Sequence, residues 1–192
     1  HVFTIWDKEF IMAVWNVINH TEVGASGISY YEETSISGSY DHLCLMASIR
    51  HDTIDSGAYI AQSDLQINGD TASNYSYVRM NSGSTTTSSG HVASHTDLAY
   101  QYGGAGPSTV ADTFGVYELW ISNYTGTTGQ MAAQSTWSIP NNSTTDWQWF
   151  IGQTGLLWKD TAAVTAIKLF PHASDKYVQY STFTLYGING AA

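Results

Sequence analysis

Short runs of alternating apolar and polar residues, separated by turn signals roughly every 8 to 12 residues, most limit what this chain can fold into. The clearest run is YDHLCLMASIRH, residues 40–51, and FGVYELWISNY, residues 114–124, alternates in the same way. No interval shows a long helical period. A period of two places successive side chains on opposite faces of a strand, so we expect Leu43, Leu45, Ala47 and Ile49 to form the core face of the first run. In the second run, Val116, Glu118, Trp120 and Ser122 oppose Tyr117, Leu119 and Ile121.

About eight to ten such strands fit the chain, which predicts an all-β protein with a single jelly-roll-like antiparallel β-sandwich. Two tracts lack strand character: NSGSTTTSSGH, 81–91, is expected as a loop or a weak edge strand, and YGGAGPST, 102–109, as a flexible loop. In the last strand, YSTFTLYGI, we expect Phe183 and Leu185 to point into the sandwich and Gly187 to let the chain bend away. This last strand covers residues 178–188, and the other expected strands cover residues 27–36, 58–69, 75–80, 131–139, 147–158 and 163–172.

The first 19 residues differ from the rest because large apolar side chains crowd there, several at helical spacing. We expect an N-terminal arm or short helix over residues 1–19, followed by the sandwich over 20–192. An arm this apolar either packs on its own domain or docks on a neighbouring subunit. Its candidate interface residues are Phe3, Trp6, Phe10 and Trp15.

The charge balance excludes two classes of partner. Only 11% of residues are charged, the net charge is -10, and Lys and Arg together number six. So few cations cannot build the basic patch that nucleic acid or an anionic membrane requires, so neither is expected as a partner. No run approaches the ~20 apolar residues of a transmembrane helix. The single cysteine, Cys44, lies in an apolar run and is expected to be a buried thiol.

No catalytic or metal-binding motif is recognisable in the sequence, so we expect no enzyme activity, no cofactor and no metal. His91 and His95 are four residues apart in a tract expected to be loop, where solvated histidines are the simpler interpretation. Asp64 and Asp70 flank an Asn-Gly-Asp turn, and turn chemistry explains Asp70 without calcium. Glu118 stands inside an apolar strand and is expected to face solvent or to pair with an arginine such as Arg50 or Arg79.

Aromatic residues are abundant, with seven Trp and thirteen Tyr. Such rings fill cores and subunit interfaces, which is the interpretation we favour here. In the alternative, a secreted carbohydrate-binding module, Trp147 and Trp149 share one face of the expected strand WQWF and bind a glycan.

A series of segments carries a resemblance to a known group. In order they are SYDHLCLMASIRHD, LQINGDTASNYSYVRM, ELWISNYTGTTGQ, GLLWKDTAAVTAIKLF and STFTLYGI. In its strands and turns over roughly residues 28–188, the chain resembles β-rich structural proteins of tailed-bacteriophage virions.

The resemblance implies a jelly-roll-like, non-enzymatic virion component at the surface of the phage particle. It implies a homo-oligomer, with trimers common in the group, whose partners are the major capsid protein or neighbouring virion subunits. The first alternative is a head decoration, or cement, protein that binds and stabilises the capsid. The second is a tail-fibre or spike domain that recognises host glycans.

Overall fold

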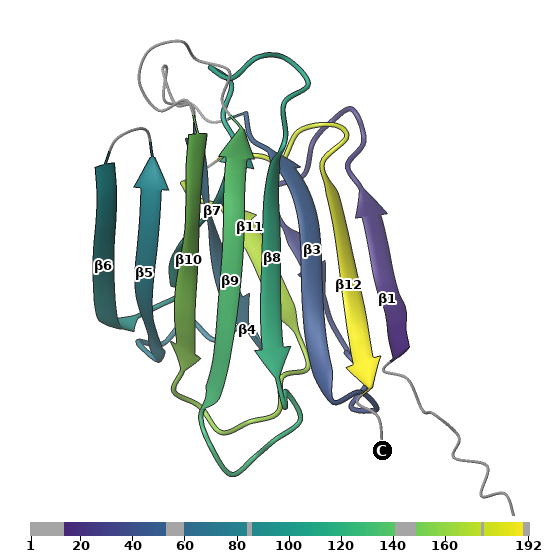
Figure 1. The fold of residues 1–192 in the computed structure, drawn as a ribbon. Helices are drawn as coiled ribbons and strands as arrows, with labels where there is room; N and C mark the ends of the chain where they lie inside the picture. The colour runs from purple at the N-terminus through teal and green to yellow at the C-terminus, as the bar shows by residue number, and fades with distance from the viewer. Residues whose placement is uncertain (1–13, 53–59, 84–85, 141–148, 174, 190–192) are drawn as a thin grey trace, which may run out of the picture.

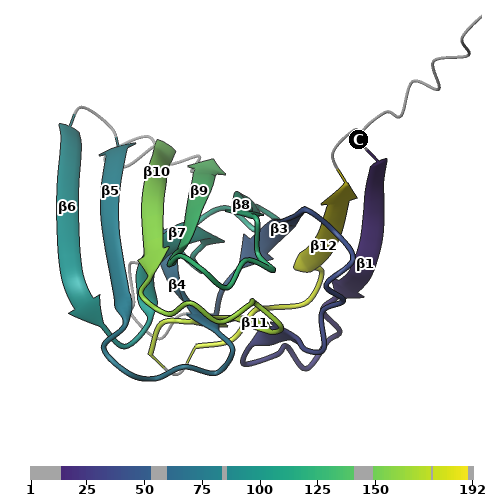
Figure 2. The same cartoon turned by 90° about the horizontal axis from the view of Figure 1, so that it is seen from below.

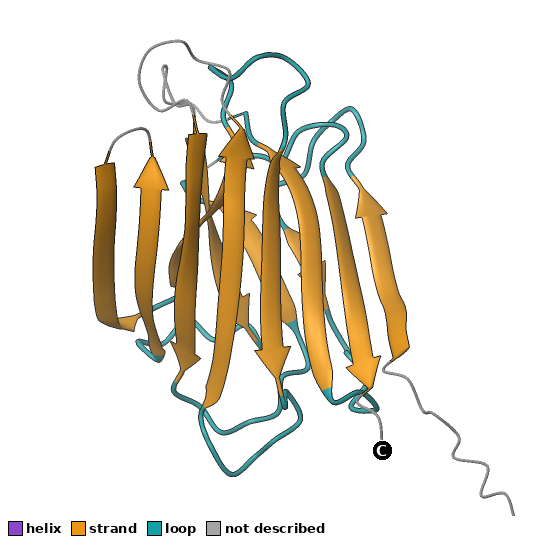
Figure 3. Cartoon of the chain, in the orientation of Figure 1, coloured by secondary structure: helices purple, strands orange, loops and turns teal. Residues whose placement is uncertain are grey.

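The structure is a computed structural model, and it describes residues 14–52, 60–83, 86–140, 149–173 and 175–189. These residues form twelve strands and no helix, so the described part has no helix that is long and apolar enough to cross a membrane (Figure 3). The prediction of an all-β fold is confirmed.

Eight strands form the larger layer of the molecule, and each is antiparallel to its neighbours. Figure 1 shows them side by side. In spatial order they are β6 (Thr86–His95), β5 (Tyr75–Gly83), β10 (Trp149–Trp158), β9 (Met131–Pro140), β8 (Gly115–Ser122), β3 (His42–Arg50), β12 (Thr182–Asn189) and β1 (Val14–Glu22).

Four strands form the smaller layer, in the order β2 (Tyr31–Glu33), β11 (Ile167–Pro171), β4 (Ile60–Ile67) and β7 (Leu98–Ala105). Figure 2 shows β4, β7 and β11 beneath the middle of the larger layer, with β6 and β1 at its two ends. A short parallel pairing of Ile49 and Arg50 with Gly104 and Ala105 joins β3 to β7. The sheet is therefore mixed and folds over into a sandwich, and its strand order does not by itself establish a jelly roll.

The core lies between the two layers, where the alternating residues of both meet. Leu43, Leu45 and Ile49 of β3 are buried there, and so are Phe183 and Leu185 of β12. In β8 the burial alternates without exception, with Tyr117, Leu119 and Ile121 inside. The core faces predicted for β3 and β12 are confirmed, and in β8 the structure shows which of the two opposed sets is buried.

Residues 102–105 complete strand β7, so the prediction of a flexible loop there is wrong. Glycine serves close packing at this point. A Cβ on Gly104 would lie 2.3 Å from the His51 ring, and one on Gly103 (φ 142°) would lie 3.0 Å from the Cβ of Tyr117. Strand β7 therefore needs glycine at these positions for close packing, although the same glycines led to the prediction of a loop. Of the tract 81–91, residues 81–83 end β5 and residues 86–91 belong to the edge strand β6, so an edge strand, one of the two predicted states, is confirmed for residues 86–91.

The predicted boundary after residue 19 falls inside strand β1, which pairs with β12 in the register Trp15 with Ile188. Residues 14–19 are therefore strand and not helix. Gly187 does not let the chain bend away, because β12 runs on to Asn189. Its missing side chain instead makes room for Tyr40, whose ring would lie 2.3 Å from a Cβ at that position.

Candidate interaction face

The side of the larger layer that points away from the smaller layer is here called the outer face. Strand alternation directs a set of apolar side chains onto it that are 37% to 60% exposed. A monomeric protein seldom leaves so many large apolar groups exposed along one sheet. They are Trp15 of β1, Met46 of β3, Val78 and Met80 of β5, Val116 of β8 and Ile151 of β10, together with Val17.

The outer face is almost free of charge. One cross-strand row runs from Met80 through Gln153, Thr136 and Glu118 to Met46. Among the outer-face positions from β5 to β12, Glu118 is the one carboxylate, and the one cation is Arg50 at the end of β3, whose guanidinium binds the loop before β8. The chain carries 16 acidic residues in all, so the rest of its surface holds nearly all of the charge.

Glu118 accepts a hydrogen bond from the Nε1 of Trp120 on its own strand. The predicted arginine partners are engaged elsewhere. The Nη1 of Arg50 donates to the Oγ1 of Thr109 at 2.8 Å and to two carbonyl oxygens of the same loop. Arg79 donates to the hydroxyl of Tyr102 at 3.1 Å. Of the two predicted alternatives, the arginine partner is therefore wrong, and Glu118 lies on the outer face.

Three aromatic rings form a cluster on the outer face near β1. Trp15 meets Trp120 edge to face with centroids 5.3 Å apart, and it meets Tyr186 at 5.4 Å. Cys44 lies between Trp120 and Tyr186 in the strand register and is fully buried. Burial, and secondly the charge of Glu118, raise the pKa of the Cys44 thiol to about 12. The thiol is buried as predicted, and Trp15 packs on its own domain.

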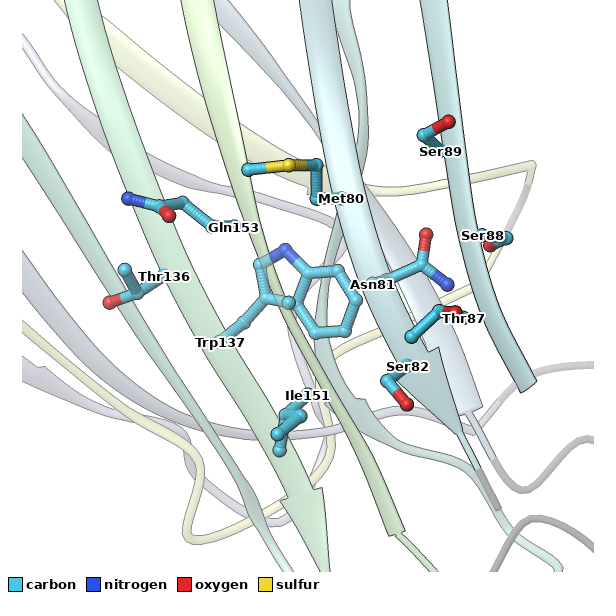
Figure 4. A pocket seen from close by; sticks show the side chains of 11 residues that line it. Met80, Asn81, Ser82, Thr87, Ser88, Ser89, Thr136, Trp137, Ile151 and Gln153 are labelled. Atoms are coloured by element: carbon cyan, nitrogen blue, oxygen red, sulfur yellow. The ribbon is translucent and has the colours of Figure 1, made fainter. Parts of the chain in front are cut away.

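Two shallow hollows lie on the half of the outer face formed by β6, β5, β10 and β9. The first has a volume of about 640 Å³ and combines apolar Met80 and Ile151 with the amides and hydroxyls around them (Figure 4). The second, of about 570 Å³, lies over Gly155, where a Cβ would meet nothing closer than the Val78 carbonyl at 3.9 Å.

The residues predicted to bind partners are only partly described. Phe3, Trp6, Phe10 and Trp147 lie outside the described residues, and so does the side chain of Trp149 at the start of β10. Sequence reasoning missed the exposed residues Val78, Met80 and Ile151. Their signal is apolar residues on the otherwise polar face of an alternating strand.

His91 and His95 both belong to β6, so their placement in a loop was wrong. A bulge at Ser94 (φ 69°) shifts the register, so His91 pairs with Val78 on the outer face and His95 with Tyr75 on the inner face. They cannot share an ion. Across the described ranges, no group of three or more His, Cys, Asp or Glu is arranged to hold a metal.

Ser63 and His51 form a buried pair of the residue types that serve as nucleophile and general base in some enzymes. The Oγ of Ser63 lies 3.4 Å from the Nε2 of His51 and 3.0 Å from the hydroxyl of Tyr177. His51 and Ser63 are each only 1% exposed, so no substrate reaches them from solvent. Burial, partly opposed by Asp175, lowers the pKa of His51 to about 4. This cluster belongs to the core.

Comparison of the chain with protein-family models, with curated proteins and with solved structures gave no significant match. The resemblance to phage virion proteins therefore stays a prediction.

Proposed function

We propose that this chain is a non-enzymatic structural protein of a phage particle, a head decoration protein that binds and stabilises the capsid through its outer face. The observation that carries the proposal is the combination of exposed apolar side chains on that face with a single carboxylate among its positions from β5 to β12. Depletion of charge at the centre and exposure of apolar groups are typical of surfaces that bind other proteins.

The size of the outer face supports the same proposal. Eight strands spaced ~4.8 Å apart, with about eight residues each at ~3.3 Å, cover on the order of 1,000 Å². A stable, specific interface needs roughly 800 Å² on each partner. In a shell, each copy would also gain from the simultaneous contacts of its neighbours.

The test measures binding to phage heads. The heads are purified from the phage that encodes this protein, in a form that lacks the protein. Recombinant protein should bind at a fixed number of copies per head, counted by quantitative mass spectrometry. The double substitution Met80→Lys with Ile151→Lys should abolish binding, because it places two cations on the face. Val110→Lys is the control, since Val110 is 54% exposed and belongs to the loop before β8 and not to a strand of the face.

Two results would contradict the proposal. Normal binding of the double variant would remove the outer face as the binding site. Recovery of the native protein on tails instead of heads would remove the decoration role.

The tail-fibre alternative has one observation in its favour. The hollow in Figure 4 is lined by uncharged hydrogen-bonding groups, including Asn81, Thr136 and Gln153, beside apolar Met80 and Ile151. Such a lining suits the hydroxyls and apolar faces of a sugar. Under this alternative, a glycan array shows specific binding that Gln153→Ala weakens, and an array without any binding excludes it.

A further inference from the structure

We infer that strand β6 pairs edge to edge with β6 of a second copy of this chain, so that the larger layers of two copies form one continuous sheet. In the described part of the chain, β5 is the one strand that pairs with β6. Figure 1 shows β6 at the end of the larger layer. Its ten residues, TTSSGHVASH, include no Lys, Arg, Asp, Glu or Pro.

Exposed edges of this kind are normally protected. Proteins guard an edge with charges, proline, a bulge or a very short strand, because its free N–H and C=O groups bind any other strand. Residues 86–93 of β6 have none of these devices, and the only irregularity of the strand is the bulge at Ser94 near its end.

The other two end strands do carry such protection. β1 has a register shift between Val17 and Asn19 and ends in Glu22, and the side chain of Asn19 donates to Glu33. β2 is only three residues long and contains Glu32 and Glu33. The contrast identifies β6 as the edge that is built to pair.

Charge favours a second copy as the occupant of this edge. The chain has a net charge of -10, so most of its surface repels another copy at neutral pH. Strand β6 has no acidic residue, so two copies can approach each other there without repulsion between carboxylates.

The sequence of β6 also fits an antiparallel pairing with itself. A two-fold axis at Gly90 places Ser89 opposite His91 of the second copy and Thr87 opposite Ala93 of the second copy. Each pair shares one face, as antiparallel pairing requires, and no like charges meet. The regular pairing would stop at Ser94, where the positive φ ends the straight part of the strand.

The contact does not depend on what the outer face binds. It is a two-fold contact through a strand edge, and it is separate from the threefold contacts that the resemblance to virion proteins implies. It would place the hollows of two copies on one continuous surface. Since seven residues per copy bury a small area, we expect a dimer that forms at micromolar concentration.

Sedimentation velocity of the whole chain tests this inference over about 1 to 500 µM, a range that brackets a micromolar dissociation constant. We expect a monomer–dimer equilibrium. The variant Thr87→Lys with Ser89→Lys should weaken it by about tenfold or more, because four cations would meet along the seam. Both the β1 control, His20→Lys, and the outer-face control, Met80→Lys, should dimerise like the original chain. Circular dichroism checks that every variant folds.

Hydrogen exchange then locates the contact. Amides of residues 87–93 should gain protection as the concentration rises, whereas those of β1 should not. The inference is overturned by a chain that stays monomeric throughout, by dimers that the β6 variant forms equally well, or by dimers that Met80→Lys abolishes. The experiment needs no phage particle, so its failure is distinguishable from a failure of head binding.

Discussion

The Nε1 of Trp158, at the end of β10, donates to the Oδ2 of Asp70 at 2.7 Å across 88 residues of sequence. Asn74 donates to the same oxygen at 2.8 Å, and the backbone N–H of Ala72 donates to the Oδ1. The turn predicted at Asn68-Gly69-Asp70 is confirmed, and the Asp70 carboxylate accepts protein hydrogen bonds.

The first prediction is that Asp70→Ala lowers the free energy of unfolding by about 1–3 kcal/mol, because the buried indole N–H of Trp158 loses its acceptor. Burial works to raise the pKa of Asp70, but the hydrogen bonds from Trp158, Asn74 and Ala72 outweigh it and lower the pKa below 3.8. The stabilisation is therefore present above pH 3.8 and is lost as the pH falls through the lower folded value. Urea unfolding measures both effects.

Asp160→Ala is the control for that substitution, because Asp160 accepts a local hydrogen bond from the N–H of Ala162 at an exposed turn. If Asp70→Ala lowers the free energy of unfolding by no more than Asp160→Ala does, the hydrogen bond from Trp158 contributes nothing to stability.

The second prediction concerns pH and His51. Its folded pKa of about 4 lies below the ordinary 6.5 because of burial, so between these values the unfolded chain binds a proton that the folded chain does not. The free energy of unfolding should therefore fall by about 3 kcal/mol between pH 6.5 and pH 4. His51→Gln should remove most of this slope, whereas exposed His91→Gln should keep it. If the free energy of unfolding depends on pH equally in both variants, His51 is not the source of the pH dependence.

The third prediction compares two glycines inside strands. Gly187→Ala should destabilise the fold by about 1–3 kcal/mol, since its Cβ would overlap the ring of Tyr40. Gly155→Ala should be tolerated, because the nearest atom to its Cβ would be 3.9 Å away. Thermal unfolding measures both. Combining Gly187→Ala with Tyr40→Ala should recover part of the loss, and the absence of any recovery would argue against this clash.

The fourth prediction tests the two faces of β12. Phe183 is fully buried and stacks on Tyr31 with centroids 4.8 Å apart, and it meets Tyr177 at the same distance. Phe183→Asp should abolish soluble folding, because an unpaired carboxylate would enter the core. Thr184→Asp changes the next residue, on the outer face, and should fold. Soluble, cooperatively unfolding Phe183→Asp protein would show that the faces are assigned the wrong way round.

The fifth prediction concerns Cys44. The thiol should react slowly with a thiol reagent in the folded protein, because it is buried and its pKa is raised to about 12. Trp15→Ala should raise the reaction rate by about tenfold or more. Removing the indole ring exposes the Cys44 thiol to the reagent, and the reactivity of a thiol depends on its exposure. Val14→Ala changes the neighbouring exposed residue, on the opposite face, and is the control. An unchanged rate for Trp15→Ala would mean that Trp15 does not cover the thiol.

Much of the fold could be predicted because strand alternation is a local property. Side chains alternate between faces with a period of two, so apolar residues at every second position predicted which face of β3 and of β12 is buried. Turn residues such as Asn68 and Gly69 act over a few positions, and they marked the end of β4 correctly. The low charge of the chain likewise required no knowledge of the fold.

Local sequence patterns were enough to predict that this chain is all-β, where most of its strands run and which faces of β3 and β12 enter the core. The structure was needed to show that residues 102–105 form a strand, because their glycines are explained by contacts with His51 and Tyr117, which are distant in sequence. It also decided that Val78, Met80 and Ile151 lie together on one nearly uncharged face and that β6 forms an unprotected edge. Strand order and layering depend on contacts between distant segments, and no local pattern in the chain specifies those contacts.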